Sequence, residues 1–334
     1  MRILLFLSFA LALCSITAEE ITPYKFKDGK DLEQNYLVPS SSRFTVARNN
    51  ESDPNITYYC TKPEKSSYPI AIFCTGSSNK KLLYSIIHLH RYFLQELLNL
   101  NCAVVTVEQW GIDENSINQE DFFSHYTRSQ RLQDHQTVIN FFLSNPPEGW
   151  NGKFIFLGVS EGGPIVLTLA QEYPNDTLAT VCWSGAGDDS WLDELWVFIE
   201  KLKPTFPWWI KLWSYVPKSF PFALDVPHSK EEYENIMMAT LNNPTDKKNF
   251  FNMTYLYHAD ALTYQKDDYE KLTTPLLIVT GAKDSIIESS DRFVEKAKQA
   301  QCPVTYLRVE DMDHYVRKRP DILEQSFAWL KNVT

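Results

Sequence analysis

The chain has 334 residues, of which 44% are hydrophobic, and a formal net charge of −10. Its 42 acidic residues outnumber the 32 basic ones and no basic cluster is present, which excludes electrostatic binding of nucleic acid. A chain of this length and hydrophobic content can fill the core of one large α/β domain, because such folds often reach about 250 residues as a single unit.

The N-terminus has the pattern of a secretory signal peptide. Arg2 is followed by an apolar run at 3–14 and then by small and polar residues up to Ala18. Such a run is too short to span a bilayer, and no later run is long enough, so no stable membrane insertion is expected. The pattern predicts that residues 1–18 are removed after Ala18 and that the protein is secreted or periplasmic. The alternative is an N-terminal helix that belongs to the fold.

Segments of strand type and helix type alternate along most of the remaining chain. Two short β-type runs separated by a turn-rich segment, 43–47 and 56–61, predict a hairpin at a sheet edge. Strands are expected at 70–74, 103–107, 154–157, 180–183, 276–280 and 304–309, and helices at 82–98, 129–143, 165–170, 289–301 and 322–331. This alternation predicts an α/β fold with a mostly parallel central sheet and helices on both faces.

The interval 188–265 interrupts the alternation. It has helical segments, no clear core strand and five of the nine tryptophans. We interpret it as a cap inserted into a core formed by 19–187 and 266–334. Trp208 and Trp209 are candidates for an apolar roof over a substrate, together with Trp110 after the strand at 103–107. The alternative is that the cap aromatics form the cap's own core.

The most informative stretch is the corner between the strand at 154–157 and the helix that follows. Residues 158–163 read Gly-Val-Ser-Glu-Gly-Gly. A turn this short between strand and helix forces its central residue into a strained backbone conformation and exposes its side chain, and the flanking glycines leave room for the turn. Ser160 would then lie at a helix N-terminus, where unpaired N–H groups favour a developing negative charge. The pattern predicts a nucleophile elbow.

This elbow, with the strand order and the later acidic and basic residues, resembles the α/β-hydrolase superfamily over nearly the whole mature chain. The resemblance implies a triad in the chain order serine, acid, histidine, with Ser160 as nucleophile. His314 follows the final strand, where the family keeps its base. Asp284 follows the strand at 276–280, at the family's usual acid position, and Asp188 and Asp189 after the preceding strand are the alternative acids.

Other titratable residues are interpreted as structural. Asp311 and Asp313 are expected to be solvated loop residues. The remaining histidines are expected on the surface or in packing: His88, His90, His125, His135, His228 and His258.

An oxyanion hole needs two backbone N–H donors near the nucleophile. The resemblance assigns one to Glu161, directly after Ser160. The second should come from the loop after the strand at 70–74, where many members have His-Gly but this chain has Thr-Gly-Ser. That departure leaves Ser77 or Ser78 as the donor, and we take Ser77 as the candidate.

Five cysteines remain after the signal peptide: Cys60, Cys74, Cys102, Cys182 and Cys302. Cys74, Cys102 and Cys182 lie in or beside apolar runs and are interpreted as buried hydrophobic residues, not as a disulfide framework or metal site. One bridge remains open in an oxidising compartment. Asn50, Asn55, Asn175, Asn252 and Asn332 each begin a glycosylation sequon, which a eukaryotic secretory pathway would use.

These features predict a secreted serine hydrolase that cleaves a carboxylic ester or thioester through an acyl-enzyme. One alternative is a serine exopeptidase, because the elbow also resembles that of prolyl-oligopeptidase-like peptidases. The other is a binding protein that keeps the fold without turnover. The expected partner is a small-molecule, acyl or peptide substrate. No cofactor or metal is expected, since the mechanism needs neither, and the sequence carries no signal for an oligomeric state.

Overall fold

The computed structural model describes residues 43–50, 52–65, 67–78, 83–114, 116–205 and 226–334. The expected signal peptide and the tryptophans at 208, 209 and 213 lie outside the described residues.

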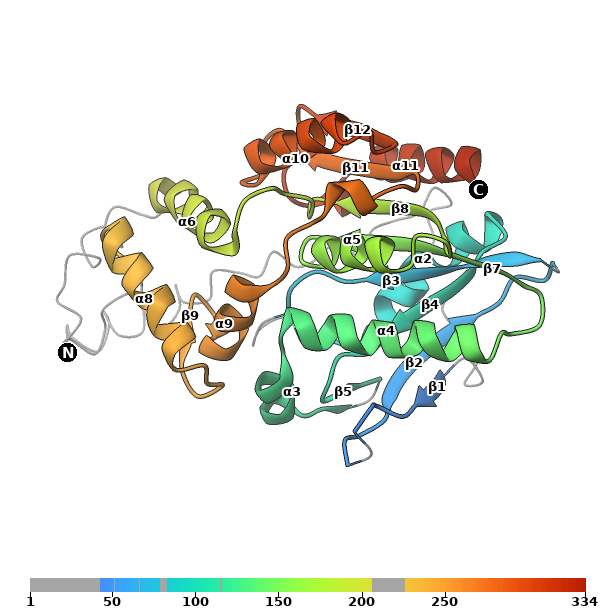
Figure 1. The fold of residues 1–334 in the computed structure, drawn as a ribbon, viewed down its shortest axis with the longest axis horizontal. Coiled ribbons are helices and arrows are strands. Elements are labelled where there is room, and N and C mark those ends of the chain that lie inside the picture. The colour runs from blue at the N-terminus through green and yellow to red at the C-terminus, as the bar shows by residue number, and fades with distance from the viewer. Residues whose placement is uncertain (1–42, 51, 66, 79–82, 115, 206–225) are drawn as a thin grey trace, which may run out of the picture. The chain divides into compact units, whose positions relative to one another are not determined.

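An eight-stranded sheet forms the centre of the fold, with strand order β1-β2-β4-β3-β7-β8-β11-β12 (Figure 1). The hairpin strands β1 and β2 pair antiparallel, and β2 also runs antiparallel to β4. All other neighbours are parallel. The strands are β1 (Arg43–Val46), β2 (Ile56–Thr61), β3 (Tyr68–Cys74), β4 (Ala103–Val107), β7 (Trp150–Val159), β8 (Thr177–Trp183), β11 (Leu276–Gly281) and β12 (Val304–Val309). The predicted mostly parallel sheet and edge hairpin are confirmed.

Both faces of the sheet are covered by helices, which explains why the central strands are apolar on both sides. Every residue of β3 and β4 is buried, as expected for parallel strands inside an α/β fold. The covering helices are α2 (Ile87–Asn99), α4 (Arg128–Ser144), α5 (Gly162–Glu172), α10 (Ile287–Gln299) and α11 (Pro320–Val333).

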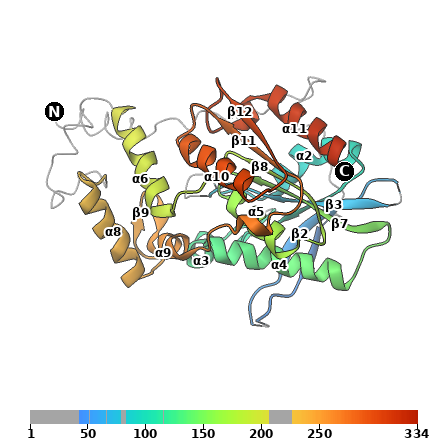
Figure 2. The same ribbon diagram turned by 45° about the horizontal axis from the view of Figure 1, so that its top comes forward.

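The two faces have separate apolar cores. On one face, residues of α4, α5 and α10 such as Val138, Ile165 and Phe293 belong to a single core cluster (Figure 1). On the other face, Phe93 of α2 stacks on Trp183 of β8 with ring centroids 5.7 Å apart. Phe327 of α11 packs against both rings. Figure 2 shows α11 and α4 on opposite sides of the sheet.

Two regions differ from the sequence prediction, the start of helix α2 and the segment after β4. Helix α2 begins at Ile87, later than the apolar stripe suggested. The Glu108 carboxylate, which follows β4, accepts hydrogen bonds from the Ser85 hydroxyl and the Ile86 N–H, so a residue distant in sequence fixes the start of this helix. The segment expected to be a polar loop contains β5 (Ile112–Asp113), β6 (Ser116–Ile117) and α3 (Gln119–His125).

The described residues of the segment 188–265, namely 188–205 and 226–265, contribute no strand to the eight-stranded sheet. Its described part consists of α6 (Trp191–Leu202), a short 3-10 turn (Lys203–Thr205), α8 (Lys230–Asn242), the strand pair β9 (Asn249–Phe250) and β10 (Met253–Thr254), and α9 (Tyr255–Thr263). Leu195, Ile199, Tyr233, Met237 and Phe250 form a core cluster within it.

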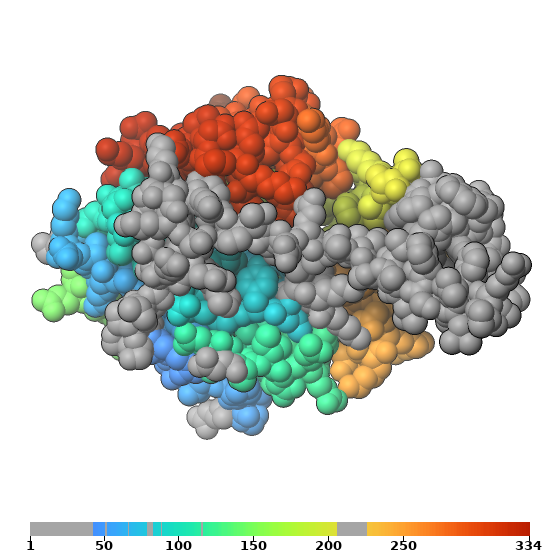
Figure 3. Space-filling model, turned by 180° about the vertical axis from the view of Figure 1, so that it is seen from behind, coloured from blue at the N-terminus to red at the C-terminus, as the bar shows by residue number. Residues whose placement is uncertain are grey.

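The two described tryptophans of this segment are engaged in packing. Trp196 packs on Tyr233, and Trp191 packs on Tyr257 and His258. In Figure 3, the reverse side, α6 in yellow lies next to the C-terminal elements in red. A salt bridge of 3.0 Å between Lys201 and Glu288 joins α6 to α10 there.

The five cysteines that follow the expected signal peptide are free of disulfides. Cys74, Cys102, Cys182 and Cys302 are buried, and Cys60 is half-buried. Burial raises the pKa of the Cys60 thiol to about 11 and that of Cys74 to about 12. Thiols in this state are protonated and behave as small apolar groups, as the sequence predicted for three of them. Within the described chain, no helix has the length and apolar character needed to cross a bilayer.

Candidate active site

Ser160 lies at the corner between β7 and α5 with a backbone φ of +52°, in the left-handed region. A non-glycine residue held there stores of the order of 1 kcal/mol or more of strain. Its N–H donates to the Trp183 carbonyl at 2.8 Å, which fixes the corner to β8. Close backbone approaches surround it. A Cβ on Gly162 would lie 2.2 Å from the Cys74 carbonyl oxygen, and a Cβ on Gly185 would lie 2.1 Å from that of Ser160. Only glycine fits at these two positions.

The structure brings together the three residues expected to form a triad. His314 Nε2 lies 2.9 Å from Ser160 Oγ, and His314 Nδ1 lies 2.8 Å from Asp284 Oδ2. The Asp284 side chain is fully buried, whereas the His314 side chain is 37% exposed. The three residues follow β7, β11 and β12, so each comes from the carboxyl end of a parallel strand. The arrangement can transfer the Ser160 proton to the imidazole and stabilise the resulting positive charge.

The pKa of His314 lies above its ordinary value of 6.5. Burial of the ring acts to lower it, but the hydrogen bond to Asp284 and the negative charge of Asp284 raise it by more. The carboxylates of Glu194 and Asp313 raise it further. Asp284 therefore favours the protonated form of the imidazole.

The alternative acids, Asp188 and Asp189, form ion pairs with basic residues of α10. Asp188 accepts from Lys296 Nζ at 2.8 Å, and Asp189 accepts from Arg292 at 2.5 Å. Asp311 and Asp313 are in exposed ion pairs of the loop, as the sequence suggested.

Three other described histidines are buried in packing. Burial lowers the pKa of His90 to about 3 and the pKa values of His135 and His258 to about 4. They are neutral at pH 7. The ring of His90 bonds to two threonine hydroxyls, that of His135 to a backbone carbonyl, and that of His258 to a backbone carbonyl and to the indole N–H of Trp191.

The two candidate oxyanion donors can be compared with the alternative at Ser78. The Ser78 N–H donates to the Tyr126 hydroxyl at 2.8 Å and is therefore occupied. Within the described part of the chain, the N–H groups of Ser77 and Glu161 have no hydrogen-bond partner. This leaves Ser77 and Glu161, and not Ser78, as available donors beside Ser160. A Cβ on Gly76 would lie 3.1 Å from the Ser160 Cβ, so the loop passes close to Ser160.

The sequence prediction used only the backbone of Glu161 and missed its side chain. This carboxylate is 3% exposed and accepts hydrogen bonds from Arg131 Nη1 at 2.7 Å and from the hydroxyls of Tyr126 and Tyr257, each at 2.9 Å. A charged residue inside an otherwise apolar elbow was the available signal for such a network.

The expected pocket role of Trp110 is not supported by its surroundings. The Arg48 guanidinium carbon lies 3.9 Å from the centroid of the Trp110 ring, and the His125 ring stacks on it at 3.7 Å. Two groups this close to one centroid must lie on opposite faces, and the indole N–H donates to Asp121. Both faces and the polar edge are thus occupied by protein. The other two pocket candidates, Trp208 and Trp209, lie outside the described residues.

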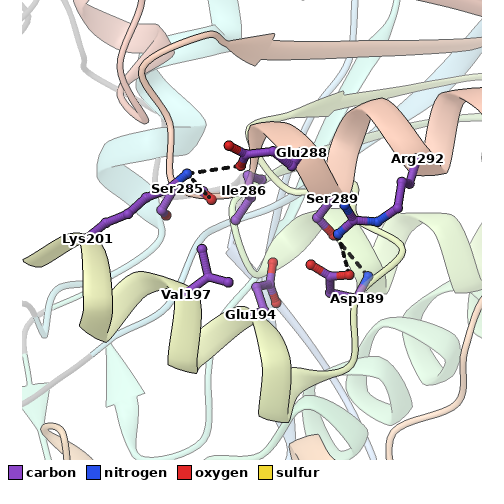
Figure 4. Close-up of a pocket in the computed structure, with 9 residues that line it drawn as sticks. All are labelled: Asp189, Glu194, Val197, Lys201, Ser285, Ile286, Glu288, Ser289 and Arg292. Atoms are coloured by element: carbon purple, nitrogen blue, oxygen red, sulfur yellow. Dashed lines mark hydrogen bonds and ion pairs between the residues drawn. The ribbon is translucent and has the colours of Figure 1, made fainter. Parts of the chain in front are cut away.

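A cavity of about 250 Å³ lies between α6 and the start of α10, next to the residues that follow Asp284 (Figure 4). Its charged residues include two ion pairs, Asp189 with Arg292 and Glu288 with Lys201. Glu194 points from α6 into this space (Figure 4). Its pKa is raised, first by burial, and Arg128 opposes this shift. The cavity lining includes neither Ser160 nor His314. The described residues contain no cluster of ligands able to hold a metal ion.

The fold and the arrangement at Ser160 define an α/β-hydrolase. Residues 88–314 match the family described as serine aminopeptidase, S33, and the chain belongs to that family.

Several solved structures share the fold at low sequence identity. Alpha/beta hydrolase domain-containing protein 10 from mouse is 18% identical with a TM-score of 0.53, over 87% of this chain and 97% of that one. A carboxyl esterase from Bacillus coagulans is 12% identical with a TM-score of 0.56, over 87% and 96%. The acylaminoacyl peptidase of Pyrococcus horikoshii is 15% identical with a TM-score of 0.52, over 87% and 40%. No curated protein matches this sequence significantly.

We expect the imidazole of His314 to titrate above pH 6.5 in the wild type and at a lower pH in Asp284→Asn than in the wild type. The substitution removes the negative charge of Asp284, which raises the pKa, and leaves the burial that lowers it. Nuclear magnetic resonance of labelled histidine, assigned with His314→Gln, measures both midpoints.

The raised pKa of His314 also makes the free energy of unfolding depend on pH. Because the folded-state pKa exceeds the unfolded one, protonated His314 stabilises the fold below about pH 6.5, and this contribution is lost as the pH rises through the folded-state pKa. An unchanged midpoint in Asp284→Asn would mean that Asp284 does not control this histidine.

Proposed function

We propose that the protein is a serine hydrolase that cleaves a carboxylic ester or thioester through an acyl-enzyme. The observation that carries the proposal is the continuous contact from Asp284 through His314 to Ser160 Oγ, at 2.8 and 2.9 Å. A serine hydroxyl becomes a good nucleophile only when a neighbouring base accepts its proton.

In the proposed mechanism Ser160 Oγ attacks the substrate carbonyl carbon while its proton passes to His314 Nε2. The carbonyl oxygen becomes an oxyanion, which the N–H groups of Glu161 and Ser77 would stabilise. The tetrahedral intermediate expels the alkoxide or thiolate, which takes the proton from His314. Water then attacks the acyl-enzyme with His314 as base, and the acid is released as Ser160 regains its proton. Asp284 holds the ring with Nδ1–H toward its carboxylate throughout.

A serine exopeptidase is the second candidate, and the family description favours it. An aminopeptidase must bind the positive α-amino group of its substrate, which needs a carboxylate near the nucleophile. Glu194 on α6 is such a group, since it interacts electrostatically with both His314 and Asp284. The same chemistry at Ser160 would cleave an amide in place of an ester.

We expect Ser160→Ala to abolish covalent labelling by a fluorophosphonate probe and to lower kcat by about 10⁴-fold or more, with the fold retained, because no other group supplies the attacking oxygen. Ser184→Ala is the matched control. Ser184 also follows a parallel strand with a positive φ, of +50°, and should keep both labelling and turnover. Equal labelling of Ser160→Ala and the wild type would refute the nucleophile assignment. A wild type with neither labelling nor turnover would favour a binding protein on this fold.

The substrate class can be decided by a screen of short and long p-nitrophenyl esters and thioesters against aminoacyl-naphthylamides. We expect the esters or thioesters to give the higher kcat/KM, because an acyl-enzyme forms faster when an alkoxide or thiolate leaves than when an amine does. Preferential cleavage of the aminoacyl-naphthylamides would replace the ester proposal with the exopeptidase.

We also propose export of the protein, on the sequence pattern at 1–18 alone. The expected mature chain begins at Glu19, which mass spectrometry of the protein from its native host measures directly. In a eukaryotic host the sequon asparagines, all five exposed, would be candidates for glycosylation. Recovery of the chain with residues 1–18 attached would contradict cleavage.

A further inference from the structure

The buried carboxylate of Glu161 lies at the centre of a hydrogen-bond network beside Ser160. Both tyrosine hydroxyls donate to the same oxygen, Oε2, and Arg131 Nη1 donates to Oε1. The rings of Tyr126 and Tyr257 stack with centroids 5.3 Å apart and an interplanar angle of 13°. This stacking fixes the direction from which both hydroxyls approach the carboxylate.

The network extends from Glu161 to the loop that carries the other candidate oxyanion donor. The Tyr126 hydroxyl, which donates to Glu161, also accepts the Ser78 N–H at 2.8 Å. Arg131 Nη2 donates to the Thr75 carbonyl at 2.6 Å. The loop 75–78 is thus attached at both ends to groups that hold Glu161. The Ser77 N–H lies between these two attachments.

A second branch reaches the segment 188–265. Tyr257 belongs to α9, within this segment, and is 1% exposed. Its hydroxyl bond to Glu161 crosses 96 positions of the chain. The position of α9 is therefore linked to the residue whose N–H follows the nucleophile.

A buried ion pair often contributes little net stability, because desolvation of both charges offsets their attraction. The Glu161–Arg131 pair is therefore poorly explained as a stabilising device alone. Its geometry has a specific effect: it holds two chain segments, 75–78 and 160–161, at a fixed separation.

We infer that Glu161 is a positioning residue that sets the distance between the two oxyanion donors, its own N–H and that of Ser77, with Tyr126 and Arg131 as the link to the loop and Tyr257 as the link to α9. This inference rests on the proposed hydrolase function. An oxyanion hole stabilises the transition state only when both donors are at the correct position, and small displacements cost large factors in rate.

Substitution of Glu161 itself would leave Arg131 buried without its counter-charge and could prevent folding. The test therefore uses Tyr126→Phe and Tyr257→Phe, which remove one hydroxyl each and keep the ring. The matched controls are Tyr68→Phe and Tyr233→Phe. Both control tyrosines are buried and donate one hydroxyl bond to a backbone carbonyl outside the network, that of Glu148 and that of Leu192.

We expect Tyr126→Phe to lower kcat about 10- to 100-fold with KM changed less than about threefold, and Tyr257→Phe to lower kcat by about threefold or more. The affinity for an alkylboronic acid, whose tetrahedral adduct with Ser160 carries an oxyanion, should fall by the same factors. Amide hydrogen exchange at 75–78 should become faster in Tyr126→Phe. Neither control variant should change kcat or the exchange at 75–78, even if it lowers the melting temperature as much as the network variants do.

The outcomes separate this inference from the proposed function. If turnover depends on Ser160 but the network variants match their controls in kcat and boronate affinity, the positioning role is wrong and the hydrolase proposal stands. If the wild type has no turnover, the hydrolase proposal fails, and hydrogen exchange tests whether Tyr126 holds the loop 75–78 in place. Equal exchange at 75–78 in Tyr126→Phe and Tyr68→Phe would overturn this link, and faster exchange in Tyr126→Phe alone would support it.

Discussion

The close approach of three backbone segments at the elbow is the constraint on which the rest of the site depends. Gly162 lies against the Cys74 carbonyl at the end of β3, and Gly185 lies against the Ser160 carbonyl after β8. A side chain at either glycine would push a neighbouring strand end away. Because the contacts are between main chains, they hold Ser160 in its left-handed conformation without help from flexible side chains. The strain at Ser160 is offset by the many interactions of the sheet and helices on either side.

The topology of the sheet then brings the other groups to the same place. In a parallel sheet the carboxyl ends of all strands lie on the same side, and residues that follow neighbouring strands meet there. Ser77 follows β3, Ser160 follows β7, Asp284 follows β11 and His314 comes after β12. This is why side chains separated by 154 and 30 positions along the chain lie within hydrogen-bond distance. The antiparallel strands β1 and β2 lie at the other edge of the strand order and contribute no residue to this group.

The sequence was most informative where a local pattern determines a local structure. The strand-type runs at 103–107 and 304–309 coincide with β4 and β12, and the glycine pattern located the elbow. The prediction was less accurate where a distant residue decides the outcome. Glu108 delays the start of α2, and the neighbours of Trp110 occupy the ring that was expected to face a substrate.

The side chain of Glu161 is the clearest example of a feature that sequence reasoning missed. Its partners come from the segment before α4, from α4 itself and from α9. No periodicity or motif relates these positions, because they meet only after the sheet has formed and the segment 188–265 has packed. The only indication in the sequence was an acidic residue inside a buried motif. Such a carboxylate needs a charged or hydrogen-bonding partner, because burying it unpaired costs free energy.

Two buried carboxylates therefore lie near Ser160, and their negative charges have different effects. The charge of Asp284 acts directly on the imidazole, because it raises the pKa of His314 against the effect of burial. Glu161 adjoins Ser160, where a free negative charge would repel the oxyanion of the proposed mechanism. Arg131 neutralises that charge at 2.7 Å, and the two tyrosine hydroxyls bond to its other oxygen. The carboxylate can then orient its surroundings while its own backbone N–H remains available to an oxyanion. The pairing with Arg131 is what makes an acidic residue compatible with this position, and a neutral residue could not hold Arg131, Tyr126 and Tyr257 at once.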